Sequence, residues 1–98
     1  MKIGDRVGAI LSLNGNVALF LGYGVYEGDS IPPPEVPGFL AEMCRELQRS
    51  NPTILLDNNT RVYGCECWWG SEKEVQKRLE GCHVEMTDVD LYRARAKE

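Results

Sequence analysis

The sequence predicts an α+β fold, built on a curved antiparallel sheet or an SH3-like small barrel of about five strands with two helices. Residues 6–13 alternate apolar and polar side chains, which is typical of a half-buried strand. Residues 17–21 are apolar at every position, which is typical of a central strand covered on both faces. Residues 39–49 carry an apolar stripe at helical spacing, which predicts a helix packed against the sheet. The stripe comprises Phe39, Leu40, Met43, Cys44 and Leu47.

A β-hairpin should join the first two strands. Asn14 and Gly15 lie between them, and both residue types tolerate the positive φ that tight hairpin turns require. The second strand should continue through residues 22–26 and break at Gly28-Asp29. Its two glycines should let it bend sharply and serve both halves of a small barrel.

The rest of the chain predicts three more strands and a second helix. Four of the five prolines fall in residues 30–38, which predicts an extended surface loop. Residues 53–56 and 60–69 should pair as a second hairpin around an Asp-Asn-Asn turn. Residues 71–81 should form a helix with a serine cap and little apolar surface. A last strand is expected over residues 83–86.

Length and composition fit one globular domain. The chain has 98 residues, 43% of them hydrophobic and 27% charged, which excludes disordered, collagen-like and coiled-coil chains. We therefore treat residues 1–98 as a single domain, with 88–98 as a peripheral tail. No apolar run approaches the roughly 18 residues of a membrane span, and the N-terminus lacks a signal-peptide core. We expect a cytoplasmic protein without a membrane partner, in the host cytoplasm if a phage encodes it.

The charge balance bears on the partners. Eleven Lys and Arg residues against fifteen Asp and Glu residues give a formal charge of −4. Proteins that hold duplex nucleic acid usually present a basic face, and the one basic cluster here is the tail Arg93, Arg95 and Lys97. We expect no duplex nucleic acid as partner. A small anionic ligand is compatible, because one or two arginines with backbone N–H groups suffice to bind it.

The glycine-bearing part of the second strand is the first stretch with ligand-binding chemistry. Gly22 and Gly24 clear side chains from one face, while Tyr23 and Tyr26 add aromatic rings. This pattern predicts a groove floor on which a flat ligand stacks. The same glycines also fit a bend, or a close crossing by another segment.

The second such stretch is residues 60–69. Alternation along a continuous strand buries Cys65 and Cys67 and places Glu66 and Trp68 on the opposite face. We expect Glu66 to accept hydrogen bonds from a ligand, and Trp68 to stack on it, where this strand meets the glycine-bearing one. An ordinary exposed glutamate is the alternative, and at least one of the two adjacent tryptophans should lie in the core.

Zinc binding and catalysis are less well supported by the residue pattern. Cys65, Cys67, Cys82 and His83 are ligand types that zinc prefers. A Cys-x-Cys strand directs both sulfurs the same way, and the adjacent Cys82 and His83 would point apart, so we expect reduced thiols and no metal. His83 is the single histidine, and no motif places it beside a nucleophile. We expect no cofactor and no enzymatic activity, although an enzyme with an unrecognised site stays open.

Three longer motifs and two dipeptides resemble those of a family of small proteins found in bacteria and their phages. The similarity runs from about residue 3 to residue 81, most of the chain. Small phage proteins of this size include sponges that sequester immune nucleotide signals, such as anti-CBASS proteins. By this analogy of size and source the resemblance implies an anti-defence sponge, and it assigns no functional residue. The matching stretches are 4–10 (GDRVGAI), 22–29 (GYGVYEGD), 64–70 (GCECWWG), Asn51-Pro52 and Leu56-Asp57.

Together these observations predict a non-enzymatic protein that binds a small ligand, with a cyclic nucleotide or a related phosphate-bearing immune signal as the ligand. The alternative is an SH3-like module that binds a peptide or partner protein with the same aromatic residues. A two-sided apolar sheet on so short a chain also favours a homodimer or a higher homo-oligomer. The predicted site residues are Arg6, Gly22, Tyr23, Gly24, Tyr26, Arg61, Glu66, Trp68 and Trp69.

Overall fold

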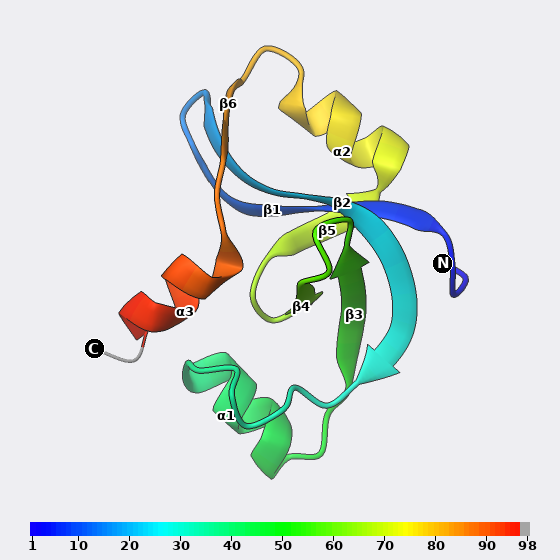
Figure 1. Ribbon diagram of the computed structural model, residues 1–98, viewed down its shortest axis with the longest axis vertical. Helices are drawn as coiled ribbons and strands as arrows, with labels where there is room; N and C mark the ends of the chain where they lie inside the picture. Colours follow the sequence, from blue (N-terminus) through cyan, green and yellow to red (C-terminus); the bar gives the residue numbers. More distant parts are fainter. Residues whose placement is uncertain (97–98) are drawn as a thin grey trace.

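The computed structural model describes residues 1–96 and confirms the α+β class with a curved sheet. The sheet has the strand order β4-β3-β2-β1-β5, with β6 paired to β2 off this path, and it does not close into a barrel within the described residues (Figure 1). The elements are β1 (Arg6–Asn14), β2 (Val17–Ser30), α1 (Phe39–Glu46), β3 (Asn51–Leu56), β4 (Arg61–Tyr63), β5 (Trp68–Ser71), α2 (Glu72–Leu79), β6 (His83–Met86) and α3 (Val89–Ala96).

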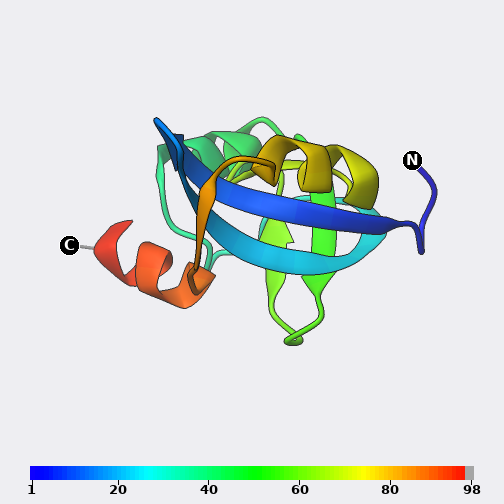
Figure 2. The same cartoon turned by 90° about the horizontal axis from the view of Figure 1, so that it is seen from above.

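The central strand is β2, as its unbroken apolar run predicts. One of its edges pairs with β1 along most of its length, and Figure 2 shows the two strands curving together. The other edge is shared. Its first part pairs in parallel with β6 as far as Phe20↔Met86, and its second part pairs antiparallel with β3 from Gly24↔Leu56 onward. Between these partners the edge of β2 has no neighbouring strand among the described residues.

The first hairpin forms one position later than predicted. Asn14 pairs with Val17, so the two turn residues are Gly15 and Asn16. Gly15 has φ 60, the left-handed conformation that such two-residue turns require. β2 also does not break at Gly28-Asp29, because a register shift between Tyr26 and Asp29 lets pairing with β3 resume at Asp29.

The single strand predicted over residues 60–69 is wrong. The chain forms β4, turns through residues 64–67, and then forms β5. The turn closes because the Glu66 N–H donates to the Tyr63 carbonyl at 2.8 Å, and the Glu66 carboxylate accepts from the Tyr63 N–H at 3.2 Å. β4 pairs with β3 in the predicted hairpin, whereas β5 crosses to the edge of β1. The facing inferred from strand alternation therefore does not hold.

Two packed clusters on the sheet hold most of the core. One contains Val7, Ala9, Leu21, Ile54, Leu56, Val62 and Val89. The other lies under α2 and contains Ile10, Phe20 and Val75. The predicted serine cap of α2 is confirmed, since Ser71 Oγ accepts from the Glu74 N–H at 3.2 Å. As predicted, α2 is a thin cover that offers Val75 and Leu79 to the core.

The apolar stripe of α1 does not face the core, contrary to the prediction. Of the helix, only Ala41 is buried, and it packs with Val36 and Tyr63. Val36 belongs to the proline loop, which is therefore partly buried rather than a surface loop. The Arg45 guanidinium donates to the carbonyls of Pro33 and Val36 at 2.8 and 3.0 Å. This clamp turns the Ala41 face of α1 inward and its apolar stripe outward.

The segment expected as a peripheral tail contains α3, which is attached to the rest of the protein. Val89 is 1% exposed and belongs to the core. Residues 97 and 98, the end of the predicted tail and of its basic cluster, lie outside the described residues. In the described part, none of the helices has the length and apolar character needed to cross a membrane.

Leu21→Ala should destabilise the protein by about 2–5 kcal/mol, because Leu21 is 2% exposed in the central strand and its removal leaves a cavity. Leu19 is half-buried, so Leu19→Ala should cost less. Chemical denaturation measures both, with Leu13→Ala at the exposed end of the same hairpin as control. Equal midpoints for Leu21→Ala and Leu13→Ala would contradict the central place of β2.

Candidate ligand-binding groove

A groove opens where β2 lies between its two partners on the shared edge. We call it the Gly22 groove, and its volume is about 410 Å³. Its two ends are fixed by backbone hydrogen bonds to β2, since the Thr87 N–H donates to the Phe20 carbonyl and the Asp57 N–H to the Tyr23 carbonyl, both at 2.9 Å. The lining is mostly apolar and comprises Phe20, Leu21, Gly22, Tyr23, Leu56, Asp57, Asn58 and Met86.

The two glycines of β2 have different roles. Gly22 has φ 131, and a Cβ there would meet nothing closer than Leu56 Cδ2 at 4.0 Å, so the groove is open above it. A Cβ on Gly24 would lie 2.2 Å from the Leu55 carbonyl oxygen. Gly24 therefore permits the close approach of β3. Gly24 thus fits the close crossing by another segment, and Gly22 lies in an open groove, where the stacking of a flat ligand stays a prediction.

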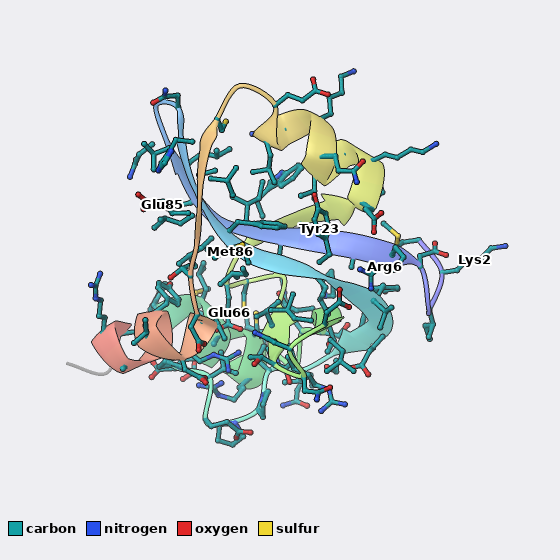
Figure 3. The ribbon with its side chains drawn as sticks, turned by 45° about the horizontal axis from the view of Figure 1, so that its top comes forward. Lys2, Arg6, Tyr23, Glu66, Glu85 and Met86 are labelled. Atoms are coloured by element: carbon teal, nitrogen blue, oxygen red, sulfur yellow. The ribbon has the colours of Figure 1, made fainter. Side chains whose placement is uncertain are left out.

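Tyr23 and Met86 form two sides of the groove. The Tyr23 ring packs edge-on against Phe20, with centroids 4.9 Å apart and planes at 73°. Burial raises the pKa of the Tyr23 hydroxyl, which stays protonated at neutral pH. Met86, at the end of β6, is 68% exposed, a large exposure for an apolar side chain. Figure 3 shows Tyr23 on β2 and Met86 beside it on β6.

Asp57 and Asn58 give the groove a polar rim at the end of β3. Both oxygens of Asp57 accept from the Arg6 guanidinium at 2.8 Å, and Arg6 Nε donates to Glu72 at 3.2 Å. These hydrogen bonds to Arg6 hold the pKa of Asp57 below its ordinary value, so its carboxylate is ionised at neutral pH. The rim thus carries one positive charge, on Arg6, and two negative charges, on Asp57 and Glu72.

Three predicted site residues, Tyr26, Trp69 and Arg61, lie in pairs away from the groove. The rings of Tyr26 and Trp69 stack with centroids 5.7 Å apart and planes at 5°, and both pack against the core. Trp69 thus fulfils the expectation of one core tryptophan. Arg61 forms an ion pair with Glu27 at 2.8 Å on the surface. None of these side chains lines the Gly22 groove.

Glu66 is not the exposed acceptor that the sequence predicts. Its side chain is 3% exposed and binds the Arg93 guanidinium through two hydrogen bonds of 2.7 and 2.8 Å. Arg93 also donates to the Arg61 carbonyl at 2.9 Å. The carboxylate is thus used to attach α3 to the turn after β4. Figure 3 shows Glu66 near α3, away from Tyr23.

Trp68 lies apart from both the groove and the Glu66–Arg93 pair, beside α2. It is 38% exposed, and the Arg78 guanidinium of α2 lies 4.8 Å from its ring centroid. Because β5 pairs with β1, its strand does not adjoin β2. Of the nine predicted site residues, the structure places Gly22 and Tyr23 in the groove, and Arg6 contacts the groove residue Asp57.

The groove residues that sequence reasoning missed are Phe20, Leu21, Leu56, Asp57, Asn58 and Met86. Asp57 and Asn58 begin a polar turn directly after a strand, the kind of position where binding residues concentrate. That signal was available in the sequence. The sequence contained no such signal for Met86, because only the parallel pairing of β6 with β2 brings this residue to the groove.

The four cysteines are free thiols. Burial raises the pKa of Cys65 to about 11 and that of Cys67 to about 12, which keeps both protonated at neutral pH. Within residues 1–96, no three His, Cys, Asp or Glu side chains gather in an arrangement that could hold a metal ion.

Comparison of the chain with protein-family models, curated proteins and solved structures finds no match. The groove and its charges are therefore the basis on which we assign a function.

Arg93→Met should destabilise the protein by about 3 kcal/mol, because it leaves the Glu66 carboxylate buried without its partner. Removing one partner of a buried ion pair usually costs about 3–5 kcal/mol. We take the lower end of this range because the Arg93 side chain is 15% exposed. Adding Glu66→Gln should restore part of the loss, because the buried charge is then gone.

Arg61→Met is the matched control. It breaks an Arg–Glu pair in which Arg61 is 55% exposed, and it should hardly move the denaturation midpoint. Equal losses for the two arginine variants would show that Glu66 does not depend on Arg93.

Proposed function

We propose that the protein binds a small ligand without converting it, and that the flat ring of this ligand occupies the Gly22 groove. The observation that carries the proposal is an open glycine on a bent central strand, flanked by Tyr23 and Met86 and edged by polar groups. Ligand sites are usually apolar clefts of about 300–1,000 Å³ with a few polar groups. The groove, at about 410 Å³, is large enough for a nucleobase.

The apolar part of the groove suits a ring. Gly22 presents no side chain, so a planar group can lie against the backbone there. The Tyr23 ring supplies an aromatic neighbour, and the Met86 thioether can adapt to the ligand's outline. Because Met86 is exposed without a ligand, covering it adds apolar burial to the binding free energy.

The polar rim favours a nucleotide among ring-bearing ligands. The Asp57 carboxylate and the Asn58 side-chain carbonyl accept hydrogen bonds, which matches the amino and ring N–H groups of nucleobases. Arg6 uses three of its five N–H groups for Asp57 and Glu72, which leaves two to donate to a phosphate. Since the rim has one positive and two negative charges, the ring should supply most of the affinity, and salt should affect binding little.

The groove also favours binding over catalysis. Its ionisable side chains are Asp57, held as a carboxylate by Arg6, and Tyr23, held protonated by burial. Neither is poised to exchange protons near neutral pH, as a general acid or base must be. A protein that holds a cyclic nucleotide signal unchanged lowers its free concentration, and we propose this sequestering role, the one that the sequence resemblance implies.

Met86→Glu should weaken nucleotide binding about tenfold or more, because it places a second carboxylate against the ring site. Val84→Glu is the matched control. It introduces the same charge on the same strand at a residue that is 39% exposed and does not line the groove. Titration calorimetry with nucleosides, cyclic mononucleotides and cyclic di- and trinucleotides measures the affinities of both variants and the parent.

Chromatography of the ligand after incubation tests the absence of turnover. Recovery of unchanged ligand is expected, and a converted product would mean an enzyme. If no nucleobase-containing ligand binds, or if both variants lose the same affinity, the Gly22 groove is not a nucleotide site. Binding of peptides alone would favour the interaction-module alternative.

A further inference from the structure

A small polar hollow lies beside β4 and shares no lining residue with the Gly22 groove. We call it the Tyr63 hollow, and its volume is about 190 Å³. The proline loop, β4 with the turn before it, and α3 enclose it. Clefts for drug-sized ligands usually measure about 300–1,000 Å³, so this hollow suits a smaller group. Its polar lining consists of Glu35, Asn59, Arg61, Tyr63 and Arg93.

The Tyr63 hydroxyl is the group that points to a ligand. Tyr63 is 7% exposed and packs with Val36 and Ala41. Within residues 1–96 its hydrogen bonds use its backbone N–H and carbonyl, and its hydroxyl has no partner. No side-chain oxygen sealed from solvent in the described part lacks a partner, so this hydroxyl reaches the surface, and it does so in the hollow. A buried tyrosine usually finds a hydrogen-bond partner for its hydroxyl, which here is left for a ligand.

The two arginines of the hollow each keep one nitrogen for a ligand. Arg61 binds Glu27 through Nε and Nη2. Arg93 binds Glu66 and the Arg61 carbonyl through the same two nitrogens. On both side chains Nη1 has no hydrogen-bond acceptor among the described residues, and the carboxylate oxygen of Asp90 lies 3.9 Å from that of Arg93. The ion pairs therefore hold the two guanidiniums in place without using all their donors.

The fold keeps these donors together. Arg61 and Tyr63 are two residues apart on β4, so their side chains extend from the same face of the strand. The ion pair with the turn after β4 fixes Arg93 of α3 beside them. The proline loop, which contributes Glu35, is held by the hydrogen bonds of Arg45 to two of its carbonyls. The hollow is thus built by contacts that are already in place without a ligand.

The hydroxyl of Tyr63 acts as a donor at neutral pH. Burial raises its pKa, and the nearby guanidiniums of Arg93 and Arg61 only partly oppose this shift, so the group stays protonated. With the two arginines and the Asn59 amide, the hollow offers mainly donors. Glu35 supplies the one carboxylate among its lining residues. A ligand that fits this arrangement is small and rich in acceptors.

We propose that the Tyr63 hollow binds a small oxyanion, either a phosphate group or a carboxylate. The Tyr63 hydroxyl and the Nη1 groups of Arg61 and Arg93 donate to its oxygens. Guanidinium N–H groups form charge-assisted hydrogen bonds with both kinds of anion. Because each arginine already has a carboxylate partner, the converging donors rather than net charge supply the affinity.

Tyr63→Phe should weaken anion binding about three- to tenfold, because it removes one hydrogen bond and keeps the ring. The hydroxyl has no partner in the protein, so the variant should unfold at the parent's midpoint. Tyr92→Phe is the matched control, since it makes the same change at a residue of α3 that does not line the hollow. NMR titrations with inorganic phosphate and with acetate, at constant ionic strength, measure the affinities.

Two charge variants test the direction of the effect. Arg61→Met should weaken binding about tenfold or more, because a charge-assisted donor is lost. Glu35→Gln should strengthen it about threefold, because it removes a like charge beside the anion. Glu42→Gln is its control, since Glu42 is exposed on α1 outside the hollow.

The two anions distinguish the possible sources of the ligand. Tighter binding of phosphate would indicate a phosphate group, and tighter binding of acetate a carboxylate, and both support an oxyanion site. A parent chain that shows no saturable binding of either anion would overturn the proposal. Equal affinities of Tyr63→Phe and Tyr92→Phe, or of Glu35→Gln and Glu42→Gln, would overturn it as well. Nucleotide binding in the Gly22 groove is a separate measurement, because the two sites share no lining residue.

Discussion

The bend of β2 near Gly22 is the constraint on which the arrangement of the other strands depends. A straight strand would offer one continuous edge to one partner. Here the edge changes partner, from β6 with parallel pairing to β3 with antiparallel pairing. The positive φ of Gly22 and the irregular pairing with β1 around Leu21 accommodate this change. The gap between the two partners is the Gly22 groove, so the feature that curves the sheet also creates the candidate site.

The Glu66–Arg93 ion pair has a comparable role for the C-terminal part. Glu66 shapes the turn between β4 and β5 through the Tyr63 N–H, and it binds α3 through Arg93. Burying both groups is costly in itself, and the gain is a defined position for the helix. Arg45 holds α1 in a comparable way, through its hydrogen bonds to the Pro33 and Val36 carbonyls. Charged side chains that sequence reasoning places in solvent or in a binding site here connect helices to the sheet.

Local patterns located four of the five predicted strands and both predicted helices. The apolar run of β2, the Ser71 cap of α2 and the last strand were each readable from a few adjacent residues. The failures depend on contacts between distant segments. Strand alternation past Gly64 could not reveal that the Glu66 carboxylate is buried, because the Arg93 guanidinium that binds it lies 27 residues away. The amphipathic pattern of α1 located its apolar face, but which face meets the sheet was decided by the proline loop.

The predicted site residues also divide into those that local signals identify and those whose position depends on contacts between distant segments. Gly22 and Tyr23 are consecutive in the sequence, and a strand glycine beside an aromatic residue is a local signal for a groove. Trp68 and Glu66 were assigned to the site because an uninterrupted strand would have brought them toward β2. Once β5 pairs with β1, the two residues separate. Met86 enters the groove only through the pairing of β6 with β2, which no pattern within β6 predicts.

Ligand binding in the Gly22 groove, as we propose it, would be coupled to the stability of β6. All four residues of β6 are exposed, so its position depends on backbone pairing with β2 more than on apolar burial. Segments with few buried contacts open most easily from the native state. A ligand that packs between Tyr23 and Met86 adds buried surface to this strand and so binds the closed arrangement better than the open one. By mass action, occupancy then shifts the population toward the closed form. The groove is therefore expected to be best formed when the ligand is present.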